Sequence, residues 1–449
     1  MKHQTIHIIG AGLAGALLAI LLVQKGHIVK VFEKRADPRK SGMEGGRSIN
    51  LALAYRGLYA LQQAGLDDKI MSQVVMMRGR MVHDMEGNNH FLRYGKDDSE
   101  VIWSVHRGRL NLALIEAAEQ QGVQIQFDAK IDSVQVASKI FTYTQHGLTH
   151  SENYEHLLAT DGAGSSIRQD LVRQGLIQER IDSLGHHYRE LEIAPDQRGD
   201  YKLEPNALHI WPRGRFMCIA LPNTEKTFTV TLFLPAQGET SFAAIQTAKE
   251  ARLFFEQYFP DALKLVEDFD QDWINNPESS LSTLYLDTWH YQDSIVLLGD
   301  AAHAMVPFHG QGMNCAFEDC LAMVNAIEQQ PNWADAIATF ESQRMDNAAA
   351  IQAMALENYI EMRDKVDDEQ FLLQRALERQ LANLHPDRFI PRYSMVSFQR
   401  VDYATAMARG NTQRQILQTL TEGKSDINQI DYARASELIH QQLDPLHYV

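Results

Sequence analysis

The sequence predicts an α/β protein in which a parallel-sheet domain is interleaved with an antiparallel-sheet domain and followed by C-terminal helices. Apolar strands that lead into turns and helices, at 6–9, 157–160 and 294–298, predict the parallel sheet. Alternating residues between about 176 and 285 predict the antiparallel sheet. Helical apolar spacing from Trp333 onward predicts the C-terminal helices.

The composition is typical of a globular protein, with 45% hydrophobic and 22% charged residues in a chain of 449, long enough for two or three domains. Its 42 Lys and Arg against 58 Asp and Glu give a net charge of −16, which argues against nucleic acid and anionic lipid as partners. The three cysteines, Cys218, Cys315 and Cys320, lack the spacing of a zinc site or disulfide framework. We therefore expect no metal and a cytoplasmic location.

An uncharged stretch at 8–23 is the one candidate targeting segment. It is shorter than the ~20 residues that a membrane span needs, and glycines interrupt it. The C-terminal part of the chain carries charges or amides every few positions. We therefore expect neither a signal peptide nor a membrane anchor.

A glycine motif follows the first strand and opens a helix expected at 13–24. In this G-x-G-x-x-G, Gly10 permits the tight turn, Gly12 lets a pyrophosphate approach the backbone, and Gly15 lets helix and strand pack closely. Glu33 ends the next strand, at 28–32, where an acid binds the ribose of an adenosine. An acid there suits FAD or NAD and repels the 2′-phosphate of NADP. The alternative is a plain glycine turn with a surface glutamate.

Two later turns favour a flavin over a nicotinamide. The strand at 157–160 ends in Asp161 and Gly162, with Arg168 on the helix that follows. The strand at 294–298 is followed by Asp300, at the edge of a parallel sheet where ligands bind. Residues 310–314 then open a helix to about Ile327, whose N-terminus would stabilise negative charge on a reduced flavin.

Together these motifs resemble the group A FAD-dependent aromatic-ring monooxygenases, over most of the chain. The resemblance implies a Rossmann-like FAD-binding domain interleaved with an antiparallel-sheet substrate domain, plus C-terminal helices. It implies bound FAD, with Glu33 at the adenosine ribose, Asp300 at the ribityl chain and Gly312 and Met313 at the isoalloxazine edge. The residues expected to bind the cofactor are Gly10, Gly12, Gly15, Glu33, Arg107, Asp300, Gly312 and Met313.

The expected domains follow from the same comparison of patterns. They are a first part of the FAD-binding domain at 1–175 with an inserted hairpin at 76–105, a substrate-binding β-sheet domain at 176–285, a second part of the FAD-binding domain at 286–365, and a C-terminal helical cap at 366–449. Within them we expect a hairpin at 76–94 with its turn at 85–89, strands at 209–211, 216–221 and 228–233, and helices at 110–121, 243–258 and 333–363.

Three blocks narrow the resemblance to the kynurenine-hydroxylating branch of the family: GRSINLAL at 46–53, NALHIWPRG at 206–214 and PFHGQGMN at 307–314. This implies NADPH- and O2-dependent hydroxylation of L-kynurenine at ring position 3, through a flavin C4a-hydroperoxide. The product, 3-hydroxy-L-kynurenine, belongs to tryptophan degradation and NAD biosynthesis. NADPH would be a co-substrate, and the protein a monomer or homodimer.

The substrate is a zwitterion, and a buried carboxylate needs a bidentate donor, which arginine supplies. Arg78 and Arg80 share a face of the expected hairpin, and the resemblance selects Arg80 with Tyr94 for the carboxylate. It adds Asn358 and Tyr393 as further head-group contacts. The remaining implied roles belong to Phe308 and His309 near the ring, with no residue assigned as acid or base.

Plainer interpretations stay open for several of these residues. Arg80 and Arg107 could be solvated charges, Tyr393 could be a packing residue, and His303 is interpreted as structural. For the whole protein, the alternatives are a flavin hydroxylase of another aromatic acid, or a non-catalytic flavin-binding regulatory protein.

Overall fold

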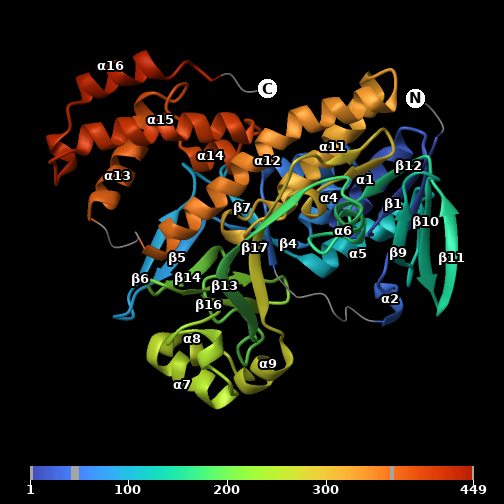
Figure 1. Ribbon diagram of the computed structural model, residues 1–449. Coiled ribbons are helices and arrows are strands. Elements are labelled where there is room, and N and C mark those ends of the chain that lie inside the picture. The colour runs from blue at the N-terminus through green and yellow to red at the C-terminus, as the bar shows by residue number, and fades with distance from the viewer. Residues whose placement is uncertain (1–3, 42–49, 365–368, 447–449) are drawn as a thin grey trace. The chain divides into compact units, whose positions relative to one another are not determined.

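The computed structural model describes residues 4–41, 50–364 and 369–446 (Figure 1). Residues 46–49 of the first block named above lie outside this range. The chain divides into two compact units. Unit 1 is formed by Met1–Val75, Ser104–His186 and Ser280–Gln352, and unit 2 by Met76–Trp103, His187–Ser279 and Ala353–Val449.

Unit 1 is built on a six-stranded sheet in the order β18-β19-β12-β1-β2-β8. Its strands are β1 (Thr5–Ile9), β2 (Ile28–Phe32), β8 (Gln124–Gln126), β12 (His156–Ala159), β18 (His290–Tyr291) and β19 (Ile295–Leu297). All neighbours are parallel except β18, an antiparallel edge strand. The central strands are almost wholly buried, as apolar runs in a parallel sheet require. The expected parallel-sheet domain is confirmed.

Helices of unit 1 pack beside this sheet. The helix α1 (Leu13–Gln24) has the expected bounds and contacts α5 (Arg107–Gln120) and α11 (Gly312–Gln329). The unit also contains α3 (Tyr55–Gln63), α6 (Ser166–Arg173), the one-turn helix α10 (Asp300–His303) and the 3-10 turn η2 (Pro307–His309). A three-stranded antiparallel sheet adds β9 (Lys130–Gln135), β10 (Ile140–Gln145) and β11 (Leu148–Asn153).

Unit 2 contains most of a seven-stranded sheet in the order β17-β13-β16-β15-β14-β5-β6. Its strands are β5 (Gly79–His83), β6 (Asn89–Arg93), β13 (Glu179–Ile193), β14 (Ala207–Pro212), β15 (Met217–Pro222), β16 (Phe228–Pro235) and β17 (Ser279–Leu286). The strands expected at 209–211, 216–221 and 228–233 are confirmed, and they pair antiparallel. However, β5 joins β14 in parallel, so the sheet is mixed.

The expected hairpin is confirmed with a shorter first strand. β5 and β6 pair from Gly79 with Arg93 to His83 with Asn89, so the chain reverses over 84–88. Residues 76 and 77 instead end β4 (Val74–Met77), which belongs to a separate sheet with β3 (Asn50–Leu53) and β7 (Ile102–His106). The hairpin belongs to unit 2, where β5 pairs with β14.

Three helices that follow β16 in the chain lie against the strands of the seven-stranded sheet (Figure 1). α7 (Ala248–Tyr258), α8 (Pro260–Leu263) and α9 (Phe269–Asn275) bury a cluster of aromatic side chains against these strands. The expected helix at 243–258 ends where predicted, but the predicted start is wrong, because α7 begins at Ala248. Thr247 and Glu250 form a capping box, which stops the helix from extending toward Ala243.

The C-terminal helices are confirmed. They are α12 (Trp333–Asp364), α13 (Glu369–Leu384), α14 (Arg392–Ser397), α15 (Tyr403–Thr421) and α16 (Tyr432–Gln442). The last of these helices share an apolar core around Leu377, Leu381 and Phe389. None of the helices in the described ranges has the length and apolar character of a transmembrane span. The division into an FAD-binding domain, a substrate-binding domain and a helical cap stays a prediction.

Candidate functional site

Two glycines of the N-terminal motif are required by close contacts within the protein, and the third faces open space. Gly10 has φ +98°, and a Cβ there would lie 2.8 Å from the oxygen of Thr160. A Cβ on Gly15 would lie 1.9 Å from the oxygen of Gly10. A Cβ on Gly12, by contrast, would meet no atom within 4 Å. The turn is therefore closed on the protein side and open at Gly12, where a pyrophosphate would approach.

The other features of a dinucleotide site surround this turn. The N-cap residue of α1 is Gly12, which has no side chain to cap the helix, so first-turn N–H groups can bind an anion. Glu33 is buried at the end of β2, where it accepts hydrogen bonds from Ala11 N at 2.7 Å and Arg35 N at 2.9 Å. Asn111 Nδ2 donates to the oxygen of Ala11 at 2.8 Å. These residues fit the adenosine and pyrophosphate parts of FAD.

Asp300 and Gly312 begin two helices that lie against each other. The carboxylate oxygen Oδ1 of Asp300 is 4.0 Å from the place where a Cβ on Gly312 would stand. The side chain of the N-cap residue Gln311 does not cap α11, and Met313 in the first turn is buried. Asn314 holds this end by donating to Ala52 O and Gly310 O and accepting from Ala54 N. The structure thus brings Asp300, Gly312 and Met313 together in unit 1.

The other residues of unit 1 singled out from the sequence differ in burial. Arg107 is exposed and begins α5, as expected of a helix-start arginine. Phe308 and His309 are buried in η2, which Gly310 ends with φ +68°. Arg168 is buried and donates to Ala301 O and Ala163 O, so it has a structural role between α6 and α10.

In unit 2, three predicted substrate residues form one cluster, called here the head-group cluster: Arg80, Tyr94 and Tyr393. The guanidinium carbon of Arg80 lies 5.5 Å from the ring centroid of Tyr94 and 5.8 Å from that of Tyr393. The two rings stack with centroids 5.2 Å apart. Arg80 Nε is buried and, within the described residues, has no hydrogen-bond partner. The other candidate, Arg78, instead pairs with Asp98 at the surface.

Electrostatics fix the protonation states of this cluster. Burial lowers the pKa of Arg80, but Tyr94, Tyr393 and Glu361 outweigh it and raise that pKa overall. Burial raises the pKa values of Tyr94 and Tyr393. The cluster therefore holds one permanent positive charge beside two stacked, neutral phenols.

Asn358 and Glu361 lie one turn apart on α12. Asn358 is buried, and its Nδ2 donates to Met362 Sδ at 3.4 Å. Glu361 forms an ion pair with Arg375, and its charge acts on Arg80. The sequence reasoning missed Glu361. The spacing from Asn358 was the available signal, because residues three apart share a helix face.

Comparison with known proteins gives one family for the whole chain. A family model described as FAD binding domain matches residues 2–355. Kynurenine 3-monooxygenase of Xanthomonas axonopodis pv. citri (strain 306) is 52% identical over 448 residues, covering 99% of this chain and 98% of that protein. Kynurenine 3-monooxygenase of Xanthomonas campestris pv. campestris (strain 8004) is 51% identical over 445 residues, with the same coverage of both chains.

Solved structures share the fold at low identity. A tetrameric 2-methyl-3-hydroxypyridine-5-carboxylic acid oxygenase matches with a TM-score of 0.68 and 19% identity, over 82% of this chain and 94% of that one. PqsL of P. aeruginosa, in complex with 2-aminobenzoylacetate, matches with a TM-score of 0.66 and 19% identity, over 81% and 97%. The predicted fold class and the use of FAD are thereby confirmed. The chain belongs to the FAD binding domain family and, within it, to the kynurenine 3-monooxygenase family of FAD-dependent monooxygenases.

Proposed function

We propose that this protein hydroxylates L-kynurenine at ring position 3, with NADPH and O2 as co-substrates. Two relatives that carry the name kynurenine 3-monooxygenase and are more than half identical over almost the whole chain support the reaction. The head-group cluster of unit 2 supports the substrate, and the glycine turn of unit 1 supports the cofactor.

For the cofactor, Gly10, Gly12 and Gly15 would shape the pyrophosphate turn, and Glu33 would bind the adenosine ribose. Both carboxylate oxygens of Glu33 accept one backbone N–H each, and each keeps a second acceptor position for a ribose hydroxyl. The remaining proposed contacts to FAD are Arg107, Asp300, Gly312 and Met313. The first turn of α11 would favour negative charge on the reduced flavin.

The observation that carries the proposed substrate is the buried donor of Arg80. A guanidinium presents donors in a fork that matches a carboxylate. Here its Nε is buried and, among the described atoms, unpartnered. A buried charged donor without an acceptor is costly, so a carboxylate bound beside it would recover that energy. The neutral phenols of Tyr94 and Tyr393 can donate to the same carboxylate.

The other end of the amino-acid head group carries positive charge. Glu361 supplies negative charge near Arg80, and Asn358 offers an amide oxygen one turn away on α12. A zwitterion needs both signs within a few ångströms, whereas a simple aromatic acid needs only the positive one. The negative charge of Glu361, which acts on Arg80 although Glu361 is also ion-paired with Arg375, supports kynurenine over an aromatic acid without an ammonium group.

Bound FAD would supply the redox chemistry, taking reducing equivalents from NADPH and using O2 as the oxygen donor. The chain's own residues bind the head group, orient the aromatic ring and exclude water. Phe308 and His309 stay proposed neighbours of that ring. No protein base is required, because the ring amino group itself donates electron density to the carbon that is hydroxylated. Oxygen transfer through a flavin C4a-hydroperoxide, which the sequence resemblance implies, is part of this proposal.

The test uses three substrates that differ only at the head group: L-kynurenine, its decarboxylated analogue and its deaminated analogue, 4-(2-aminophenyl)-4-oxobutanoate. Oxygenated products are identified by mass spectrometry in the presence of NADPH. We expect 3-hydroxykynurenine from L-kynurenine and at least about tenfold lower kcat/KM with either analogue, since each loses one charged contact. Equal turnover of the decarboxylated analogue would contradict the role of Arg80. Hydroxylation of a different aromatic acid in preference to L-kynurenine would replace the proposed substrate.

A further inference from the structure

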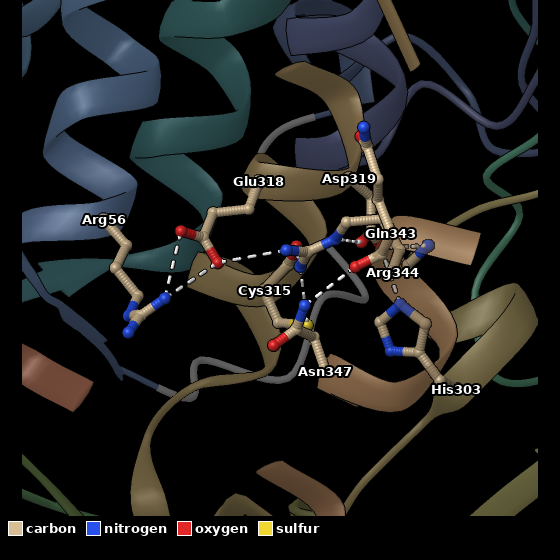
Figure 2. Close-up of polar contacts among 9 residues, drawn as sticks. Arg56, His303, Cys315, Glu318, Asp319, Gln343, Arg344 and Asn347 are labelled. Atoms are coloured by element: carbon tan, nitrogen blue, oxygen red, sulfur yellow. Dashed lines mark hydrogen bonds and ion pairs between the residues drawn. The ribbon is translucent and has the colours of Figure 1, made fainter. Parts of the chain in front are cut away.

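A buried network of charged side chains crosses unit 1 along α11. We call it the α11 charge network: Arg56, His303, Glu318, Asp319 and Arg344. Figure 2 shows Arg344 between the two carboxylates, with Arg56 beyond Glu318 and His303 beyond Asp319. Arg344 Nε donates to Asp319 Oδ1 at 2.7 Å, and Arg56 donates to both oxygens of Glu318 at 3.1 Å. Two arginines thus balance two carboxylates in the interior.

Asp319 uses its second oxygen to hold both ends of α10. Oδ2 accepts from His303 Nε2 at 2.6 Å and from Gly299 N at 3.2 Å. Gly299 precedes α10 with φ +59°, and His303 is its last residue. A Cβ on Gly299 would lie 3.0 Å from the Cβ of Ala316 on α11. Asp300, the first residue of α10, is therefore fixed between two groups that bond the same carboxylate.

The direction of each hydrogen bond follows from the charge of Asp319. Burial raises the pKa of Asp319, but neighbouring His303 and Arg344 outweigh burial and hold that pKa at about 2. An ionised carboxylate only accepts, so His303 Nε2 carries the hydrogen. His303 Nδ1 is buried and, within the described chain, has no hydrogen-bond partner. His303 therefore makes its one described hydrogen bond to Asp319, and its ring packs on Trp289 at 4.8 Å.

A metal ion is a poor alternative for this place, although His303, Cys315 and Asp319 offer ligand atoms within 4.8 Å of one another. The guanidinium of Arg344 already contacts Asp319 and the Cys315 sulfur, at 2.7 Å and 3.4 Å. Burial also raises the pKa of the Cys315 thiol, which disfavours the thiolate that a metal needs.

We propose that His303 and Asp319 are positioning residues for the flavin. They fix the turn at 299–300 against α11, so that the Asp300 carboxylate and the first turn of α11 keep the spacing that FAD requires. This inference rests on the proposed function, because it takes Asp300 and Gly312 as cofactor contacts. A buried network with balanced charges suits this task, since removing one member leaves charged partners without compensation.

The test compares His303→Leu, which cannot donate to Asp319, with His303→Gln, whose amide nitrogen reaches the place of Nε2. The holoenzyme is diluted in steps, and release of FAD is followed by flavin fluorescence. We expect His303→Leu to bind FAD about tenfold more weakly or worse, because it loses a hydrogen bond to a buried charge. His303→Gln should stay within about threefold of the unchanged protein. If His303→Leu does not fold, His303→Asn, whose shorter amide falls short of Asp319, takes its place.

His156→Leu is the matched control. His156 is also buried, makes one hydrogen bond within the described residues, to Asp293 O at 3.0 Å, and stacks on Trp333. It begins β12, at the amino ends of the parallel strands, whereas Asp300 follows the carboxyl end of β19. It should lose stability without losing FAD affinity. Three results would overturn the inference. The first is unchanged FAD affinity in His303→Leu, and the second is an equal loss of affinity in His303→Leu and His303→Gln. The third is a loss of FAD affinity in His156→Leu equal to that in His303→Leu. Asp300→Asn separates the two proposals: FAD binding unaffected by this change would refute the proposed flavin site itself.

Discussion

Tyr94 and Tyr393 stack with ring centroids 5.2 Å apart and planes 14° from parallel, although Tyr94 follows β6 and Tyr393 lies in the first turn of α14. Arg80 lies within 6 Å of both ring centroids. Two segments distant in the sequence thus enclose one guanidinium in unit 2. This arrangement gives the head-group cluster its chemistry, a fixed positive charge with neutral donors around it.

Substituting Arg80 with lysine should raise the KM for L-kynurenine about tenfold or more, because lysine keeps the charge but loses the fork geometry. Steady-state kinetics and the FAD content of the purified variant measure the two effects separately. FAD content should be unchanged. Arg78→Lys is the control, since Arg78 is paired with Asp98 at the surface and should leave KM unaltered. A similar KM in both variants would contradict the proposed contact.

Substitutions of Gly12 and Gly15 by alanine should separate cofactor binding from folding. Gly12→Ala has room in the protein, so its thermal stability without FAD should be kept while FAD binding is lost. Gly15→Ala would force a Cβ to 1.9 Å from the oxygen of Gly10, so this variant should fold poorly even without FAD. Calorimetry and flavin absorbance report these two outcomes. Normal FAD content in Gly12→Ala would show that the pyrophosphate lies elsewhere.

His83 should make the stability of the protein depend on pH. Burial and the neighbouring His209 lower the pKa of His83 to about 4, against roughly 6.5 in an unfolded chain. Between these values the unfolded state binds the proton more readily, so stability is full above about 6.5 and falls as pH drops toward 4. The slope from one such group is at most about 1.4 kcal/mol per pH unit.

His83→Gln removes the titrating group but keeps a donor for His209 Nδ1, which accepts from His83 Nε2 at 2.8 Å. Urea unfolding at several pH values between 4 and 7 should therefore show a smaller slope in this variant. His90→Gln, at an exposed histidine of β6, serves as the control and should leave the slope unaltered. An equal slope in all three proteins would refute the assignment to His83.

The family membership also predicts how substrate and cofactor communicate. L-Kynurenine should accelerate reduction of the bound flavin by NADPH, which stopped-flow absorbance measures directly. Arg80→Lys should need higher kynurenine concentrations for the same acceleration. A reduction rate independent of kynurenine would rule out this form of control.

Sequence patterns predicted the local elements well and the distant contacts poorly. The bounds of α1 and β2 agree with the expectation, because glycines and apolar runs define them locally. The parallel pairing of β5 with β14 was missed, since periodicity says which face is buried but not which strand is the neighbour. α7 begins later than the expected position 243, and the sequence contains the signal for this, because Thr247 and Glu250 have the spacing of a capping box.

The candidate site shows the same division. Family motifs were needed to choose Arg80 over Arg78, and the structure shows the physical difference, a buried donor against a surface ion pair. The bond between His303 and Asp319 was beyond sequence reasoning, because a histidine behind a strand-end acid gives no sign of its partner. Contacts between segments that are distant in the sequence become visible only in the folded structure.

We expect the protein to couple NADPH oxidation to hydroxylation of L-kynurenine. The direct measurement is NADPH consumption with and without L-kynurenine, with 3-hydroxykynurenine determined in the same samples. We expect slow NADPH consumption without L-kynurenine, a large increase with it, and about one 3-hydroxykynurenine formed per NADPH oxidised in that increase. Consumption that does not respond to L-kynurenine, or that rises without forming 3-hydroxykynurenine, would contradict it.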